Sequence, residues 1–307
     1  MLAIFSQLAI LFVIIAVGYA LKRLGIMTKD FDERLSKVVL DATLPAMILG
    51  SVLAADTLPS PAQIGTSFLL SLESYAVLIA FALAATAVLR VKPGQRGVYR
   101  FMIIFSNVGF IGFPVLSAVY GSEAIIYGSI MNLPFNVLVF TVGAYLLAQD
   151  NECGVKVRVN AQMFRSPTLV ACIASIALAA ANIHSVPFVG DALNALGAMT
   201  TPAALLIIGS SLANLPLRDL VGTPRLWVCS LLRVVAAPLV VWAVFHPFVS
   251  DPELLGILVI IAAMPVATNG TLLCYQYGGD SRTMAQGTFI TTVLSLATIP
   301  ALVAFVA

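Results

Sequence analysis

The sequence is poor in charge: only 10% of its 307 residues are Asp, Glu, Lys or Arg, whereas 60% are hydrophobic. A soluble globular protein averages about 25% charged residues, so this composition excludes an ordinary water-soluble domain. The formal net charge is only +2, and the absence of a long basic run or acidic tail argues against a nucleic-acid partner. The composition therefore predicts an all-α integral membrane protein that meets the lipid bilayer over most of its surface.

Cysteine and histidine are scarce as well. The cysteines, Cys153, Cys172, Cys229 and Cys274, lack CxxC spacing, so we predict neither a disulfide framework nor a metal site. Both histidines lie at the ends of apolar segments rather than in their middle. The sequence also lacks HExxH, GxSxG, a phosphate-binding loop and a GxGxxG before a helix, so we predict no cofactor, and nothing favours an enzyme.

Apolar segments of membrane-spanning length make up most of the chain. A bilayer core of about 30 Å needs about 20 apolar residues per helix, and by this rule we count about ten transmembrane helices. The longest connection, 150–166, separates a first set of five helices, within 1–149, from a second set of five, within 167–307. The predicted spans are 3–22, 34–54, 62–90, 97–119, 123–148, 167–184, 190–213, 224–247, 253–277 and 282–306.

Lysine and arginine concentrate in every second connection between these spans. The intervening connections, 55–61, 120–122, 185–189 and 248–252, contain neither residue. The positive-inside rule therefore places the basic connections in the cytoplasm and both termini on the extracytoplasmic side. Because an odd number of spans lies on each side of the cytoplasmic loop 150–166, the two halves run in opposite directions, as in an inverted repeat.

Two spans are interrupted near their centres. The interruptions are SNVGFIGFP (106–114) in span four and PVATNG (265–270) in span nine. Paired mid-depth breaks mark the binding site of a secondary transporter, because open backbone groups survive in a membrane only around an enclosed cavity. The alternative is that these are ordinary kinks with glycines for close helix packing. The predicted substrate-binding residues are Asn107, Gly109, Pro114, Pro265, Asn269 and Gly270.

Three charged residues lie in the interior of the spans, away from the span ends, namely Asp41 in span two, Glu73 in span three and Arg233 in span eight. Each costs at least about 2.5–3.5 kcal/mol to insert, so each needs a partner or a wet cavity. We predict that Glu73, favoured in its neutral form by burial, and Asp41 take part in proton or ion coupling, and that Arg233 binds a substrate carboxylate. The alternatives are a structural ion pair, an Arg233 that reaches the cytoplasmic surface, and an Asp41 that satisfies the helix interruption near Pro45.

The segment SNVGFIGFPVLSAVYGSEA (106–124) strongly resembles the first crossover of the auxin efflux carrier family, which covers plant auxin carriers and bacterial carriers of small organic anions. The resemblance extends to Leu44-Pro45, to Leu232-Arg233 through Pro238, and to Ala263-Met264-Pro265, and so covers nearly the whole chain. It implies two inverted five-helix repeats with broken crossover helices four and nine, similar to the bile-acid symporter fold. It further implies a scaffold of helices one, two, six and seven and a transport domain of the others, which moves as an elevator.

Two departures from the plant members shape the expected substrate. Those carriers have an acidic residue on helix three, matched here by Glu73, and a basic residue one turn later, where this chain has Val77. They also commonly have a long hydrophilic central loop, which is short here. We therefore expect a bacterial-type secondary active transporter of the inner membrane that moves a small organic anion such as malonate or malate. The alternatives are a sodium-coupled symporter of the bile-acid type and a non-transporting receptor or scaffold; proton or sodium coupling and a homodimer are left open.

Overall fold

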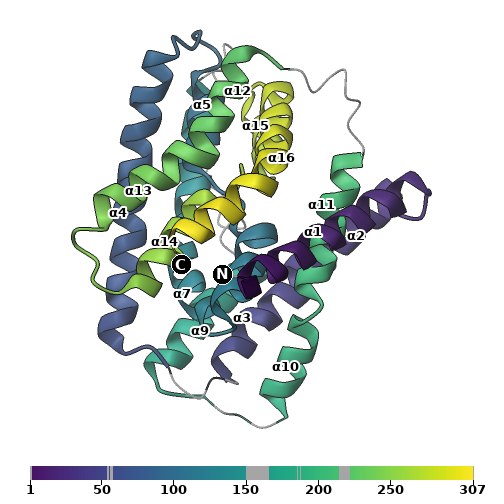
Figure 1. Ribbon diagram of the computed structural model, residues 1–307, viewed down its shortest axis with the longest axis vertical. Helices are drawn as coiled ribbons and strands as arrows, with labels where there is room; N and C mark the ends of the chain where they lie inside the picture. The colour runs from purple at the N-terminus through teal and green to yellow at the C-terminus, as the bar shows by residue number, and fades with distance from the viewer. Residues whose placement is uncertain are drawn as a thin grey trace. The chain divides into compact units, whose positions relative to one another are not determined.

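The computed structural model describes residues 2–53, 55, 58–149, 166–184, 186, 188–213 and 222–306, and every regular element in them is a helix (Figure 1). The predicted loop 150–166 lies outside the described residues apart from Ser166, and so does Cys153. In this described part of the chain, six helical segments are long and apolar enough to cross a membrane, and three shorter apolar helices accompany them. The prediction of an all-α membrane protein is confirmed, whereas the ten-helix count stays a prediction.

The chain folds into two compact units, and each unit takes segments from both halves of the sequence. Unit 1 comprises Met1–Leu69, Gly109–Leu133 and Phe164–Pro216. Unit 2 comprises Leu70–Val108, Pro134–Met163 and Leu217–Ala307. The units resemble the scaffold and transport groups implied by the family, except that 61–69 and 109–133 belong to unit 1. They do not coincide with the sequence halves, and the inverted repeat stays a prediction.

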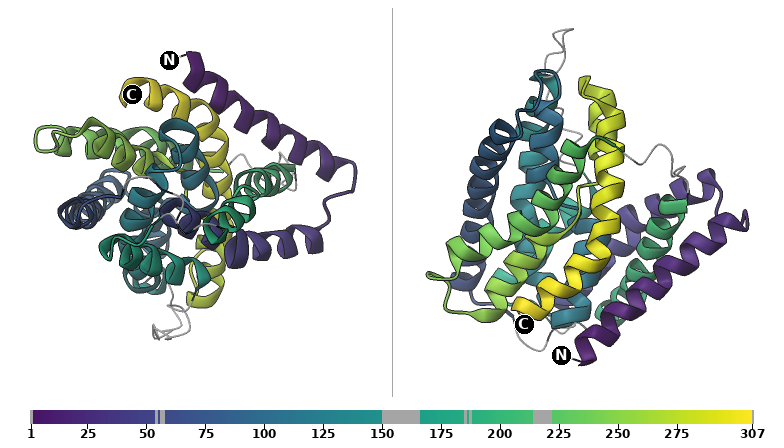
Figure 2. Two further views of the ribbon diagram at one scale, coloured as in Figure 1. Left: turned by 90° about the horizontal axis from the view of Figure 1, so that it is seen from below. Right: turned by 45° about the horizontal axis from the view of Figure 1, so that its top comes forward.

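Unit 1 is organised around α1 (Leu2–Arg23), which packs along α11 (Thr200–Ala213) (Figure 2). A Cβ added to Gly18 or to Gly209 would strike a backbone carbonyl of the other helix. Small residues at such contacts let membrane helices approach closely, so these glycines set the α1–α11 packing. The other helices of unit 1 are α2 (Lys29–Val38), the π-helical turn η1 (Val39–Thr43), α3 (Leu44–Leu53), α6 (Phe113–Tyr120), α9 (Pro167–Ala180), α10 (Val189–Gly197), and the parts of α4 (Pro61–Val88), the π-helical turn η2 (Val108–Gly112) and α7 (Ala124–Leu138) that fall in the unit.

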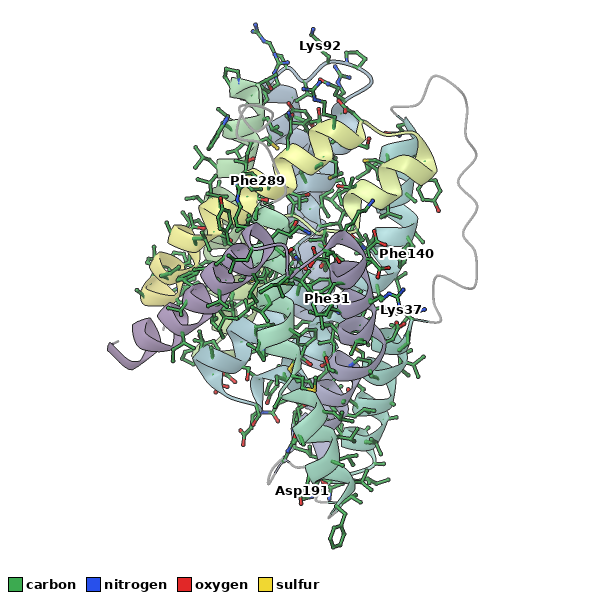
Figure 3. All side chains as sticks on the ribbon, turned by 90° about the vertical axis from the view of Figure 1, so that its right-hand side faces the viewer. Phe31, Lys37, Lys92, Phe140, Asp191 and Phe289 are labelled. Carbon is green, nitrogen blue, oxygen red and sulfur yellow. The ribbon has the colours of Figure 1, made fainter. Side chains whose placement is uncertain are left out.

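A partly buried polar contact joins three helices of unit 1 at the basic end of α1. The Lys22 ammonium lies 2.7 Å from one carboxylate oxygen of Asp32, and the Ser210 hydroxyl donates to the same oxygen at 2.7 Å. These residues come from α1, α2 and α11. Figure 3 shows Lys37 of α2 and Asp191 of α10 well apart along this unit.

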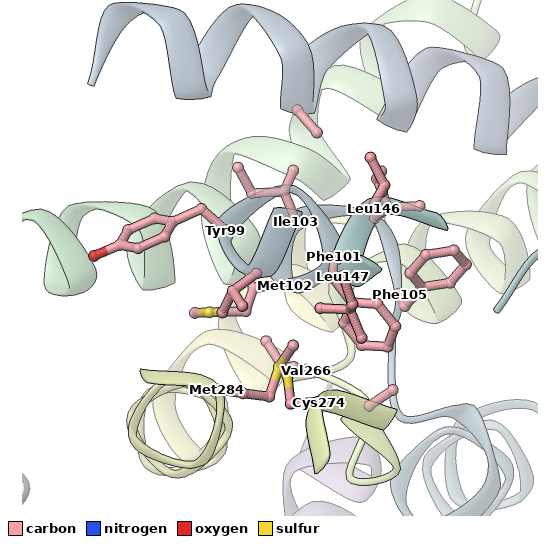
Figure 4. Packing of buried hydrophobic residues seen from close by; sticks show 14 of the residues in the cluster. Tyr99, Phe101, Met102, Ile103, Phe105, Leu146, Leu147, Val266, Cys274 and Met284 are labelled. Atoms are coloured by element: carbon pink, nitrogen blue, oxygen red, sulfur yellow. The ribbon is translucent and has the colours of Figure 1, made fainter. Parts of the chain in front are cut away.

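Unit 2 holds α5 (Arg96–Ile104) in the middle of an apolar core (Figure 4). The rings of Phe101 and Phe105 lie 4.8 Å apart between their centroids, and Met102 and Met284 pack beside them. Lys92 lies at the end of this unit, in the turn before α5 (Figure 3). The other elements are α12 (Pro224–Leu231), η5 (Leu232–Ala236), α13 (Ala237–Phe245), α14 (Pro252–Ala263), α15 (Gly270–Tyr277), α16 (Ser281–Val306), η3 (Val139–Gly143), α8 (Ala144–Gln149), and the parts of α4 (Pro61–Val88) and α7 (Ala124–Leu138) that fall in the unit.

Candidate functional site

Both predicted helix breaks are present. The helix α14 ends at Ala263, and Met264 adopts an extended conformation with φ −63° and ψ 147°. Proline disfavours helical geometry in the residue before it, so Pro265 accounts for this break. The helix α5 ends at Ile104, and Phe105 is extended with φ −101° and ψ 119°.

The two extended segments cross and pair with each other inside unit 2. Ser106 and Val266 form an isolated antiparallel bridge. The Asn107 N–H donates to the Pro265 carbonyl at 2.8 Å, and the Ala267 N–H donates to the Phe105 carbonyl at 3.0 Å. Each break therefore satisfies backbone groups of the other, which is the condition for irregular backbone at membrane depth.

Two side chains from other helices form hydrogen bonds with residues of this crossing. The hydroxyl of Thr291, on α16, accepts a hydrogen bond from the Val266 N–H at 3.1 Å. The phenol of Tyr75, on α4, is hydrogen-bonded to the Ser106 side chain. Tyr75 and Thr291 are buried, and neither was among the residues predicted from the sequence. A usable signal for Thr291 was the set of hydroxyl residues at positions 288, 291, 292 and 295, which share one helix face.

Arg233 binds the carbonyl ends of both interrupted helices. Its Nε and Nη2 donate to the Met264 carbonyl at 3.1 and 2.9 Å, and its Nη1 donates to the Ile103 carbonyl at 2.7 Å. The side chain is 0% exposed. The predicted contact with a substrate carboxylate stays a prediction, whereas the alternative of a side chain that reaches the surface is wrong. Since each helix C-terminus carries about −0.5 charge, the two ends together balance the guanidinium.

One predicted asparagine lies in the crossing, and the other lies just after it. Asn107 is 5% exposed, and its backbone takes part in the pairing. Asn269 precedes α15, is half-buried, and makes no side-chain hydrogen bond to cap that helix. Its carboxamide oxygen is buried and finds no hydrogen-bond partner among the described residues. A buried polar atom without a hydrogen bond destabilises a fold by about 1–3 kcal/mol, so Asn269 is a candidate for contact with a ligand.

The comparisons with known proteins agree with this architecture. Residues 3–303 match the family described as membrane transport protein, which is the auxin efflux carrier family. The chain belongs to this family. An uncharacterized transporter of Methanothermobacter thermautotrophicus is 23% identical over 295 residues, which cover 94% of this chain and 93% of that protein. An uncharacterized transporter of Methanocaldococcus jannaschii is 24% identical over 299 residues, which cover 94% of each chain. This family member is therefore a multi-pass membrane transporter.

The remaining predicted substrate-binding residues of this carrier, Gly270, Gly109 and Pro114, do not all belong to one unit. A Cβ on Gly270 would lie 2.7 Å from the Phe101 ring and 2.8 Å from the sulfur of Met284, so this glycine serves close helix packing. Gly109 and Pro114 belong to unit 1. Gly109 is half-buried with room for a Cβ, and Pro114 is buried in the first turn of α6.

The two predicted coupling carboxylates are both exposed. Glu73 lies on the exposed face of α4 and not in the interior of the protein. Asp41 lies in the π-helical turn η1 and is exposed as well. The two residues belong to different units, unit 2 and unit 1 respectively. Their role in coupling stays a prediction.

Proposed function

We propose that this chain is a secondary active transporter that moves a small organic anion, a mono- or dicarboxylate such as malonate or malate, by an elevator movement. One observation carries the proposal: the crossing in unit 2 pairs two broken helices and presents Asn269, with an unpartnered amide oxygen, at the start of α15. The positive end of a helix dipole favours a carboxylate, and an amide can both donate to it and accept from a neighbouring hydroxyl.

The architecture of unit 2 supports the elevator part of this proposal. The paired segments 105–107 and 265–267, together with Arg233, Thr291 and Tyr75, all lie within this one compact unit. A body that holds the whole crossing can carry a bound solute without disturbing the hydrogen bonds that shape the site. We place this carrier in a bacterial-type inner membrane with both termini outside the cytoplasm, following the distribution of Lys and Arg in the sequence.

Uptake of labelled carboxylates into proteoliposomes tests the proposal. We expect saturable uptake of at least one mono- or dicarboxylate, and competition from others of similar size. Imposed proton and sodium gradients then separate the coupling alternatives, since a sodium-coupled symporter would require the sodium gradient. No flux for any anion in the panel would contradict the proposal and favour a receptor or scaffold.

Substitution of the two asparagines tests the location of the site. We expect Asn107→Ala and Asn269→Ala each to raise KM by about 5- to 150-fold, since a buried partner left unsatisfied costs about 1–3 kcal/mol. The matched control is Gln149→Ala, which removes an exposed amide at the end of α8. If both asparagine variants transport like the wild type, the solute binds elsewhere.

Glu73→Gln tests the coupling role of the exposed carboxyl on α4. If Glu73 exchanges protons during transport, the variant should transport with a flattened pH profile, because glutamine cannot be ionised. Glu123→Gln, a change at an exposed residue before α7, provides the control. An unaltered profile in Glu73→Gln would remove this residue from the mechanism.

A further inference from the structure

The sequence left a structural ion pair open for Arg233, but the hydrogen bonds that its guanidinium makes among the described residues go to backbone carbonyls. Three hydrogen bonds from Arg233 go to two carbonyls, at the C-terminal ends of α5 and α14. Both carbonyls accept from the same guanidinium, so the two helix ends, each with a partial negative charge of about −0.5, meet at this side chain. A full positive charge between them cancels both, and the guanidinium can bond to both ends at once because its donors lie in a rigid plane.

The local backbone of Arg233 suits this task. It lies in the π-helical turn η5, where the Ala237 N–H bonds to the Leu232 carbonyl five residues earlier. Pro238 follows directly in the first turn of α13 and has no N–H for an ordinary helical bond. A π-helical turn in an otherwise regular helix is a frequent device at functional sites. Here it carries the longest fully buried side chain of the unit toward the breaks.

We propose that Arg233 is a positioning residue for the solute site. Its charge holds the ends of α5 and α14 together, and this keeps the antiparallel pairing between 105–107 and 265–267 intact. Asn107 is the last residue of the first paired segment, and Asn269 lies two residues beyond the second, so the placement of both depends on Arg233 although it does not touch the solute. The consequence for transport rests on the proposed function, whereas the consequence for the backbone does not.

Hydrogen–deuterium exchange on the purified full-length protein tests the backbone consequence directly. The readout is exchange at the Asn107 and Ala267 amides, whose N–H groups bond across the crossing. In Arg233→Met, which keeps an unbranched side chain but loses the charge and all donors, we expect exchange about tenfold faster or more at these amides. Peptides from α1 and α11 in unit 1 should exchange as in the wild type. In Arg233→Lys the charge remains but the bidentate contact is lost, and we expect an intermediate increase.

The matched control is Arg100→Met, because Arg100 also lies on α5 but donates to the Thr86 hydroxyl rather than to a break carbonyl. We expect no change at the crossing in this variant. If Arg233→Met does not fold, Arg233→Lys decides alone: faster exchange at the crossing with unit 1 unchanged supports the proposal. Wild-type exchange at both amides in whichever Arg233 variant folds would overturn it.

Transport assays on the same variants separate this proposal from the proposed function. We expect KM for the carboxylate to rise in the order wild type, Arg233→Lys, Arg233→Met, in parallel with the exchange rates. If the carrier moves no anion, the exchange result still stands and only the proposed function fails. If KM rises in Arg233→Met while exchange at the crossing is unchanged, Arg233 acts on the solute by another route and the positioning role is refuted.

Discussion

Replacement of Thr291 by valine is the sharpest test of how the crossing is stabilised. The Thr291 hydroxyl accepts from the Val266 N–H at 3.1 Å and donates to the Gly287 carbonyl at 2.8 Å. Valine has nearly the same shape, so Thr291→Val removes the acceptor without opening a cavity. The Val266 N–H, fully buried in the middle of the break, is then left without a bond.

The magnitude follows from the cost of a buried and unsatisfied donor. That cost is about 1–3 kcal/mol, and in a membrane interior no bulk water is at hand to replace the lost acceptor. The Gly287 carbonyl loses less, because a helical carbonyl retains its bond from the backbone. We therefore expect Thr291→Val to lower the free energy of unfolding by about 1–3 kcal/mol, and Thr291→Ser to restore most of it.

The assay is reversible unfolding in mixed micelles, followed by tryptophan fluorescence. Thr292→Val is the matched control, because the Thr292 hydroxyl donates only to the Thr288 carbonyl of its own helix, at 2.7 Å. We expect this control to change stability by less than about 0.5 kcal/mol. Equal losses in Thr291→Val and Thr292→Val would refute the reasoning, since the Val266 N–H would then have no special dependence on Thr291.

Two further predictions concern other parts of the chain. Gly209→Ala should destabilise the protein by about 1–3 kcal/mol in the same unfolding assay, because the added Cβ meets the backbone of α1, whereas Gly65→Ala, with open space around it, should be neutral or slightly stabilising. Partial burial acts to raise the pKa of Asp280, but hydrogen bonds from Thr283 and Gln95 outweigh it and hold the pKa below its usual value. A carboxyl whose pKa is lowered in the folded state stabilises the fold at pH values above its ordinary pKa. Asp280→Asn should therefore destabilise the protein at neutral pH. In thermal unfolding scans, the difference in stability between the variant and the wild type should shrink as the pH falls below about 4. A constant difference across that pH range would contradict this account.

Several features of this protein follow from the sequence alone. A chain with 10% charged residues cannot be an ordinary soluble domain, and its apolar segments have the length of a bilayer core. Pro265 predicts the second break because a proline disfavours helical geometry at the preceding residue, Met264, which is a local effect. The crossover motif at 106–124 likewise predicts the family. These conclusions depend on composition and on neighbours in the chain, and both are fully present in the sequence.

Only the tertiary structure decided what the interrupted helices and the charged side chains contact. The first break begins at Phe105, nine residues before Pro114, because residues 105–107 pair with 265–267 far away in the chain. The sequence identified Arg233 and Glu73 as charged residues inside the spans, whereas only the structure shows that the first binds two carbonyls and the second is exposed. A side chain's partner depends on which distant segments fold against it. The partial charges of helix ends, which balance Arg233, do not appear among the charges of a sequence and arise only when two helices end at the same place.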